Sequence, residues 1–292
     1  MAENPVTRNE RCRRIAMKRD TTEIIEAPPL LQLHELGIAY RGSDRGERRW
    51  ILRDLSLTVQ EGEFVTIMGS SGAGKSTLLN VVAQTLQPSA GQILFKGTPV
   101  GGSDLPPNPG SNRQIGYVTQ DDNLLPWRTV WDNVMFPLTL AGKPSPGDVE
   151  RANKLLERVG LSRWLKHYPH QLSGGMRKRA SLARTLIYSP PVVLMDEPFG
   201  ALDAETRAQL QSDLLDLWAA EKKTILFVTH DINEAIALGD RIVVLSGSPG
   251  RIVLERHIDI DRPRDPELIF KAPTFAGHYD AIRGCLREAD HT

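Results

Sequence analysis

A glycine-rich segment, GSSGAGKST at residues 69–77, constrains the fold of this chain more than any other stretch. It follows EFVTIMG, a short apolar run that predicts a buried strand, and it opens KSTLLNVVAQTL, which has helical periodicity. The segment fits G-x-x-x-x-G-K-[ST], a pattern whose glycines let backbone N–H groups face phosphates. Its lysine reaches the β- and γ-phosphates, and the next hydroxyl can bind Mg²⁺. The predicted phosphate contacts are Gly69, Ser70, Ser71, Gly72, Ala73, Gly74, Lys75, Ser76 and Thr77.

Two carboxylates follow a second apolar run, VVLMDEP at residues 192–198. Strands of a parallel sheet present such residues at the carboxyl edge, where ligands bind in open α/β folds. We expect Asp196 to support Mg²⁺ through its water shell and Glu197 to polarise an attacking water. Alone, Asp-Glu after a strand is as often the start of a loop, so this interpretation depends on the glycine-rich segment.

A histidine and a glutamine end two further apolar runs, ILFVTHD and IGYVTQ. His230 can reach a γ-phosphate and hold the water and Glu197 in place. Gln120 can bring an uncharged amide to the metal and the water. A lone histidine is more often structural, and a lone glutamine is a weak signal, so both predictions depend on their neighbours.

The segment QLSGGMRKRA, residues 171–180, has the make-up of a second phosphate cradle. Ser173, Gly174 and Gly175 open a basic helix, and the N-terminus of a helix favours an anion through its free N–H groups and its dipole. The sequence therefore predicts two phosphate sites about a hundred residues apart in one chain.

The pattern of apolar and polar residues in the remaining segments predicts an α/β core. LLQLHELGIAY and WILRDLSLTV predict two antiparallel strands, and RIVVLS and GRIVLER predict a final pair. Residues 129–189 read as mostly helical, with a Ser-Pro start at residue 145. We expect a domain over residues 30–256, preceded by a disordered arm (1–29) and followed by a tail (257–292) with a short helix that packs on the core. Basic residues of the arm could instead touch acidic lipid.

Composition excludes several classes of function. The chain has 292 residues, a formal net charge of +0 and a pI near 7.1, which gives no prediction of nucleic-acid binding through bulk charge. Its two cysteines lie at opposite ends and suggest a reducing, cytoplasmic setting. There is no run of eighteen apolar residues and no secretory signal. Any work at a membrane would be done by docking onto another protein.

The ordered set of motifs resembles the ATP-binding subunit of an ABC transporter over residues 31–255. The resemblance implies a P-loop NTPase core with a parallel sheet, an N-terminal antiparallel β subdomain and a helical subdomain, and it implies hydrolysis of ATP with Mg²⁺. Residues 172–176 match the family's signature motif, in which Met176 replaces the usual glutamine. The stretch GALD, which ends at Asp203, matches a loop that crosses the dimer interface, and Tyr40 matches the aromatic that stacks on adenine, with Trp50 as a rival.

In this family two subunits pack head to tail, and each signature covers the ATP held by the partner's phosphate loop. The resemblance therefore implies a dimer with a second copy of the chain that closes on two ATPs and reopens after hydrolysis. It places the protein at the cytoplasmic face of a membrane.

The stretch TQDDNLLPWRTVWDNV resembles the nitrate, sulfonate and taurine importer group, as does DRPRDPE in the tail. In that group Leu124, Leu125, Pro126 and Trp127 lie where a separate permease docks, and an extracytoplasmic solute-binding protein delivers the solute. Trp127 could instead be a core residue.

Two other functions fit less well. A non-transport ABC ATPase that acts on nucleic acid would carry coiled-coil or zinc-bearing insertions or a second cassette, and a P-loop kinase would need no signature motif.

Overall fold

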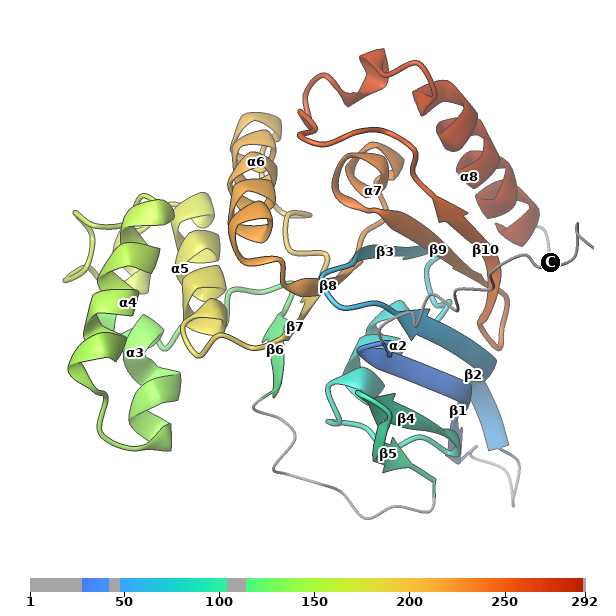
Figure 1. Ribbon diagram of the computed structural model, residues 1–292, viewed down its shortest axis with the longest axis horizontal. Helices are drawn as coiled ribbons and strands as arrows, with labels where there is room; N and C mark the ends of the chain where they lie inside the picture. The colour runs from blue at the N-terminus through green and yellow to red at the C-terminus, as the bar shows by residue number, and fades with distance from the viewer. Residues whose placement is uncertain (1–27, 42–47, 104–113, 291–292) are drawn as a thin grey trace, which may run out of the picture.

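The computed structural model describes residues 28–41, 48–103 and 114–290, so the predicted N-terminal arm lies almost wholly outside the described residues. A six-stranded sheet forms the centre of the molecule, in the order β10-β9-β3-β8-β7-β6 (Figure 1). Its strands are β3 (Phe64–Gly69), β6 (Ile115–Val118), β7 (Val192–Asp196), β8 (Thr224–Val228), β9 (Arg241–Ser246) and β10 (Arg251–His257). Neighbours from β9 to β6 pair in parallel, and β10 pairs antiparallel with β9. The expected parallel core and the expected final pair of strands are confirmed, and the structure shows that this final pair is antiparallel.

A four-stranded antiparallel sheet lies beside this core in the order β2-β1-β4-β5. It consists of β1 (Leu31–Arg41), β2 (Arg48–Val59), β4 (Ala90–Phe95) and β5 (Thr98–Gly102), of which the sequence did not predict β5. Helix α2 (Lys75–Val82) packs between the two sheets, where its apolar residues share one buried cluster with strands of both. The helix ends earlier than the periodicity of KSTLLNVVAQTL predicted.

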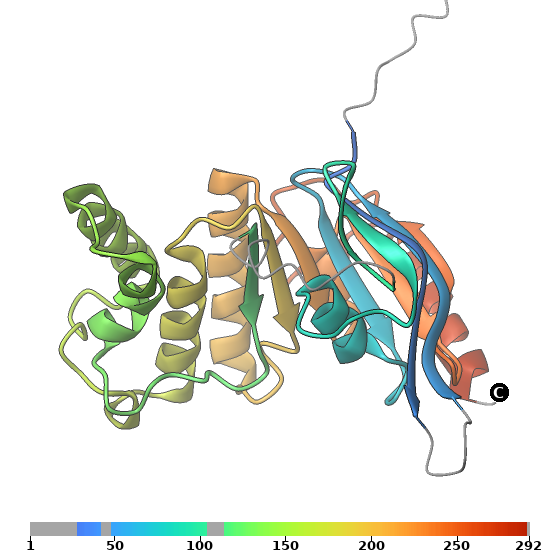
Figure 2. The same cartoon turned by 90° about the horizontal axis from the view of Figure 1, so that it is seen from below.

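Three helices form a separate layer at one end of the molecule (Figure 2). They are α3 (Val130–Ala141), α4 (Pro146–Arg158) and α5 (Gly174–Leu186), with the short 3-10 helix η2 (Pro169–Gln171) before α5. Ser145 caps α4 in a reciprocal capping box with Asp148, as the Ser-Pro start predicted. The helical character expected between residues 129 and 189 is therefore confirmed.

Helices α6 (Ala204–Glu221) and α7 (Ile232–Leu238) follow β7 and β8 and cover one face of the six-stranded sheet. The tail contains the 3-10 helix η3 (Ile269–Lys271) and, after it, α8 (Phe275–Asp290). Helix α8 packs on α7 and β9 in a third apolar cluster. Helix α8 has 16 residues, so it is longer than the short helix that was expected. Arg264 of the tail donates to the carbonyls of Ile236 (3.0 Å) and Gly239 (2.6 Å), which satisfies the C-terminal end of α7.

Candidate functional site

The glycine-rich loop joins β3 to α2 and needs glycine for steric reasons. Gly69, Gly72 and Gly74 all have positive φ, at 155°, 84° and 88°. A Cβ at Gly69 would overlap the carbonyl oxygen of Leu245, and one at Gly74 would lie 2.6 Å from Leu52 Cδ2. Gly74 is the N-cap of α2 and provides no side-chain cap. The N–H groups of the first turn are therefore left for an anion, as expected at such a helix start.

Lys75, the first residue of α2, folds back over this loop. Its Nζ donates to the carbonyls of Gly69 (2.9 Å) and Ser70 (3.0 Å). Partial burial lowers the pKa of the Lys75 ammonium, while the charges of Glu197 and Asp196 oppose that shift. The ammonium thus lies between the glycine-rich loop and the two carboxylates.

The two carboxylates occupy different surroundings at the end of β7. Asp196 is half-buried, and burial raises the pKa of its carboxyl although a hydrogen bond from Ser76 opposes the rise. This contact joins the predicted metal candidates of the glycine-rich loop and β7. Oxygen ligands such as a hydroxyl and a carboxylate suit Mg²⁺, which binds through one or two carboxylates together with substrate phosphates.

Glu197 lies one residue beyond and contacts His230. Its backbone has φ of 41°, a conformation that is uncommon for a residue with a side chain, and its N–H donates to the carbonyl of Val228 at 3.0 Å. Glu197 Oε2 is 3.0 Å from His230 Nδ1, although the two residues are 33 positions apart in the chain. The His230 side chain is 67 % exposed and that of Glu197 25 %, so the pair lies open to a ligand at the edge of the sheet.

Gln120 follows β6, the neighbour of β7 in the sheet, and is exposed. Since β3, β8, β7 and β6 are parallel, their carboxyl ends meet at one edge. The structure therefore brings the glycine-rich loop, Asp196, Glu197 and His230 to this edge. Gln120 lies two residues beyond the end of β6, the edge strand of the same sheet.

The second cradle is built at the start of α5. Ser173 caps the helix, and its Oγ accepts from the N–H of Met176 at 3.3 Å. Ser173 and Gly174 are exposed, whereas Gly175 is buried against the first turn of α6. A Cβ at Gly175 would lie 2.5 Å from Thr206 Cγ2. The second glycine is thus required by helix packing, while the serine and first glycine face outward.

Asp203 and Met176, which lie near the second cradle, each have partners within the chain. Asp203 caps α6, where its Oδ1 accepts from the N–H of Thr206 at 2.9 Å, and this contact lowers the pKa of the Asp203 carboxyl. Asp203 lies near the second cradle, because Thr206, whose N–H it accepts from, packs against Gly175. Met176 packs against the main apolar cluster, so an apolar residue is compatible with this position.

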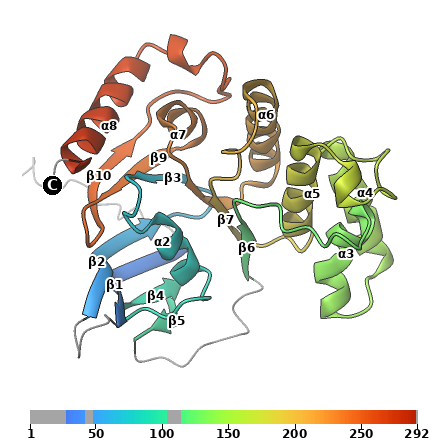
Figure 3. The ribbon, with the colours of Figure 1, turned by 180° about the vertical axis from the view of Figure 1, so that it is seen from behind.

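The second cradle is not next to the glycine-rich loop of its own chain. Helix α5 belongs to the helical layer, whereas α2 lies on the other side of β6 and β7, under the four-stranded sheet (Figures 1 and 3). A nucleotide on the glycine-rich loop of this chain would thus need a different protein surface to cover it.

Tyr40 and Trp50, the two candidates for stacking on adenine, differ in how much of the ring is already in contact with other residues. Tyr40 is 49 % exposed near the end of β1. Trp50 packs over Gly37, where a Cβ would lie 2.7 Å from its Cζ3, and Arg53 lies over its ring at 5.8 Å. The face of Trp50 is therefore engaged within its own sheet, and Tyr40 has the freer ring.

The apolar stretch after Gln120 is divided between core and surface. Trp127 is 71 % exposed, which excludes the alternative that it is a core residue. Leu124, however, was expected on the exposed cluster and is buried in the main core at 8 % exposure. It faces inward because the side chain of Asn133 holds the backbone of Leu125 through two hydrogen bonds.

An apolar groove, which Leu125 of this stretch lines, was not foreseen from the sequence. It has a volume of about 550 Å³ and is lined by Leu125, Phe136, Pro137, Leu138, Leu140, Ala141, Arg184 and Tyr188. Pro137 inside α3 was the available signal, because a proline in a helix commonly marks a special position.

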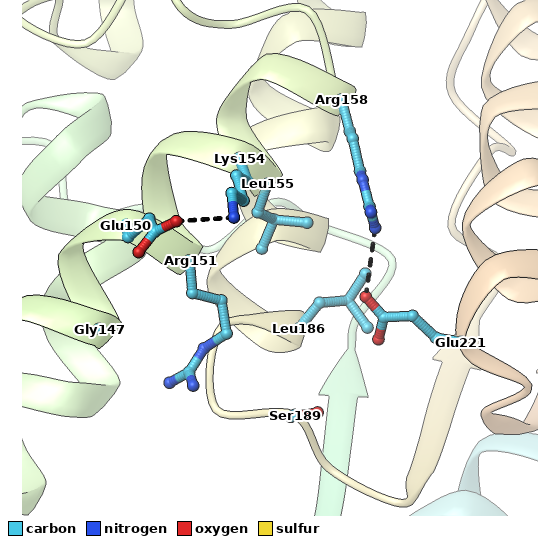
Figure 4. A pocket seen from close by; sticks show the side chains of 9 residues that line it. All are labelled: Gly147, Glu150, Arg151, Lys154, Leu155, Arg158, Leu186, Ser189 and Glu221. Carbon is cyan, nitrogen blue, oxygen red and sulfur yellow. Dashed lines mark ion pairs between the residues drawn. The ribbon is translucent and has the colours of Figure 1, made fainter.

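A second hollow lies between α4, α5 and α6 (Figure 4). It holds about 340 Å³ and three cationic side chains, but each of these already has an acidic partner. Lys154 pairs with Glu150 at 2.7 Å and Arg158 with Glu221 at 3.6 Å, while Arg151 pairs with Asp148. This hollow is therefore a poor anion site.

Comparison with known proteins gives one family. Residues 52–200 match the ABC transporter family. An uncharacterized ABC transporter ATP-binding protein of Methanocaldococcus jannaschii is 49 % identical over 220 residues, which cover 75 % of this chain and 79 % of that protein. A taurine import ATP-binding protein, TauB, of Escherichia coli O157:H7 is 44 % identical over 227 residues, 78 % of this chain and 83 % of its own length.

Among solved structures, the dimeric structure of a bacterial ABC transporter cassette superposes with a TM-score of 0.69 at 34 % identity. The match covers 79 % of this chain and 100 % of that cassette. Among the described residues, no helix combines the length and the apolar character that crossing a bilayer requires.

Proposed function

Because the chain belongs to the ABC transporter family and is an ATPase of that family, we propose that it powers a bacterial importer for a solute of the nitrate, sulfonate and taurine type. The proposal that the chain hydrolyses ATP at this site depends on one observation, the 3.0 Å distance between Glu197 Oε2 and His230 Nδ1. This pair lies at the same edge of the sheet as the glycine-rich loop. The likeness to a taurine import ATP-binding protein supports the choice of importer.

The geometry of that edge supports the proposed nucleotide site. The N–H groups of residues 69–77 receive the phosphates, Lys75 neutralises them, and Tyr40 stacks on the adenine. Ser76 and Asp196 hold Mg²⁺, with Gln120 as a further oxygen donor. The metal neutralises charge on the phosphate oxygens when it is bound.

Glu197 acts as the general base toward the attacking water. His230 Nδ1 donates to the Glu197 carboxylate and so fixes its direction, and the exposed ring of His230 extends toward the γ-phosphate. Lys75 and the N–H groups of the loop balance charge that develops during phosphoryl transfer, which depends mostly on positioning and electrostatics.

A second copy of the chain completes each site. Ser173, Gly174 and Gly175 of one protomer face the γ-phosphate held by the glycine-rich loop of its partner, and Asp203 lies at the same interface. This arrangement is supported by the distance between the two cradles within one chain and by the dimeric cassette that superposes on it. ATP binding closes the dimer, and hydrolysis reopens it, because only the closed state makes these contacts.

Separate permease subunits dock on the apolar groove that Leu125 lines and on the exposed ring of Trp127. The groove is apolar, and an exposed apolar surface of this kind marks a contact with another protein. Docking places the chain at the cytoplasmic face of a membrane, and a solute-binding protein acts through the permease.

The test uses Glu197→Gln beside the wild-type protein. Phosphate release should fall at least about 100-fold, the usual contribution of a general base. Size-exclusion chromatography of the variant should show a dimer only with ATP and Mg²⁺. A variant that still hydrolyses ATP would contradict the assignment of the base, and one that stays monomeric with ATP would contradict the shared site in the isolated chain.

A further inference from the structure

Lys178 is a buried cation that the proposed reaction does not use. It lies in the second turn of α5 and is only 7 % exposed. Its Nζ donates to the carbonyl of Thr119 at 3.0 Å and to that of Gln120 at 2.6 Å. Both acceptors are neutral carbonyls of consecutive residues. Burying an ammonium costs free energy unless its donors are used, so this contact fixes the backbone on which Gln120 stands.

Burial lowers the pKa of the Lys178 ammonium, and the charges of Asp122 and Asp121 oppose this shift. The two carbonyls also require that the chain leave the extended conformation after Val118, where β6 ends, because successive carbonyls of a strand point to opposite sides. Lys178 thus determines how the chain leaves the sheet immediately before and at Gln120.

Two further cations of α5 hold the residues that follow. Arg177 Nε contacts Asp122 Oδ2 at 2.9 Å. Arg184 donates to the carbonyls of Asp122 (3.0 Å) and Asn123 (2.7 Å). Arg177, Arg184 and Lys178 together attach residues 119–123 to a single helix, and we call these three side chains the α5 clamp. Lys178 is the most buried member, and it is the one that donates to the carbonyl of Gln120.

The same helix begins at the second cradle. Arg177 Nη1 also donates to the carbonyl of Leu172 at 2.8 Å, just before Ser173. Lys178 lies five residues after Ser173, which is little more than one helical turn. A displacement of the cradle is therefore carried to the Gln120 loop without a flexible link.

We propose that Lys178 is a positioning residue that sets Gln120 through its backbone carbonyl and ties the Gln120 loop to the helix that carries the second cradle. The inference rests on the proposed function, in which Gln120 supports the metal of the same chain's site while the cradle faces the partner's nucleotide. Lys178 would then be the link between the two sites of the dimer.

The test measures the affinity for ATP by isothermal titration calorimetry, with and without Mg²⁺, in the Glu197→Gln background so that ATP is not consumed. Lys178→Met keeps the apolar stem and removes the donors. We expect it to reduce the Mg²⁺-dependent gain in affinity about tenfold, the scale of a lost charge-assisted hydrogen bond, with metal-free affinity unchanged. Lys178→Gln keeps an amide donor and should restore part of the gain.

The matched control is Arg179→Met on the adjacent position of α5. Arg179 pairs with Asp213 at 3.0 Å and donates to the carbonyl of Val159 at 3.4 Å, two partners that lie outside the Gln120 loop. It should lower thermal stability yet leave the Mg²⁺-dependent gain as in the parent. An unchanged gain in folded Lys178→Met, or an equal loss in Arg179→Met, would overturn the role of Lys178.

A double-mutant cycle with Gln120→Ala separates this inference from the proposed function. If Lys178 acts through Gln120, Lys178→Met should add little to the loss caused by Gln120→Ala. Losses that add fully would overturn the inference and leave the role of Gln120 intact. If Gln120→Ala has no effect on the gain, the role proposed for Gln120 fails and the inference fails with it.

Discussion

The packing of Gly175 against α6 predicts the effect of a single methyl group at the second cradle. A Cβ there would lie 2.5 Å from Thr206 Cγ2, whereas carbon atoms in contact are normally about 3.5–4.0 Å apart. The start of α5 must therefore move by about 1 Å in Gly175→Ala. Thr206 cannot easily turn away, because a β-branched side chain in a helix has few χ1 alternatives.

The expected cost follows from overpacking. Inserting a methyl into a packed interface costs about 1–3 kcal/mol, and the better helix propensity of alanine returns at most about 1 kcal/mol. A net loss of about 1–2 kcal/mol lowers the Tm of a domain of this size by roughly 2–8 °C. Differential scanning calorimetry of the nucleotide-free protein measures this shift.

Two variants make the prediction specific. Gly174→Ala is the matched control for stability, because its Cβ would lie 3.6 Å from Leu202 Cδ2, an ordinary contact, and its Tm should stay near the wild-type value. Thr206→Ser removes the clashing methyl but keeps the hydroxyl, so the double variant with Gly175→Ala should regain most of the loss. Equal Tm values for Gly174→Ala and Gly175→Ala, or no recovery with Thr206→Ser, would refute the packing argument.

Two further predictions concern the groove and the metal site. Trp127→Ala should leave ATP turnover of the isolated subunit nearly unchanged and abolish transport by the complex with its permease, because the ring is exposed and outside the nucleotide site; loss of turnover or folding in the isolated subunit would argue against docking. Burial raises the pKa of the Asp196 carboxyl, so its ionised form destabilises the fold above the folded-state pKa, and this penalty disappears below the ordinary value. Without nucleotide, Asp196→Asn should therefore unfold at a higher temperature than the wild type near pH 7, and this difference should shrink as the pH falls toward 4; a difference that grows on acidification would contradict the sign.

Several local features of this protein can be predicted from its sequence alone. The glycine-rich loop, the strand before it and the start of the helix after it are set by backbone sterics and apolar periodicity within about twenty residues. The same holds for α4, whose capping box lies in consecutive letters, and for the carboxylates that end β7. Each of these features depends on residues that are close together in the chain, so the sequence contains the information needed to predict it.

Contacts between residues that are distant in the chain depend on how the strands and helices pack. Glu197 and His230 are 33 positions apart and touch because β7 and β8 are adjacent and parallel. Lys178 reaches the carbonyl of Gln120 across 58 positions because α5 packs beside the end of β6. The inward turn of Leu124 and the exposure of Trp127 likewise depend on how α3 holds the loop. Strand order and helix packing arise from burial of the whole apolar surface, and a local pattern does not carry that information.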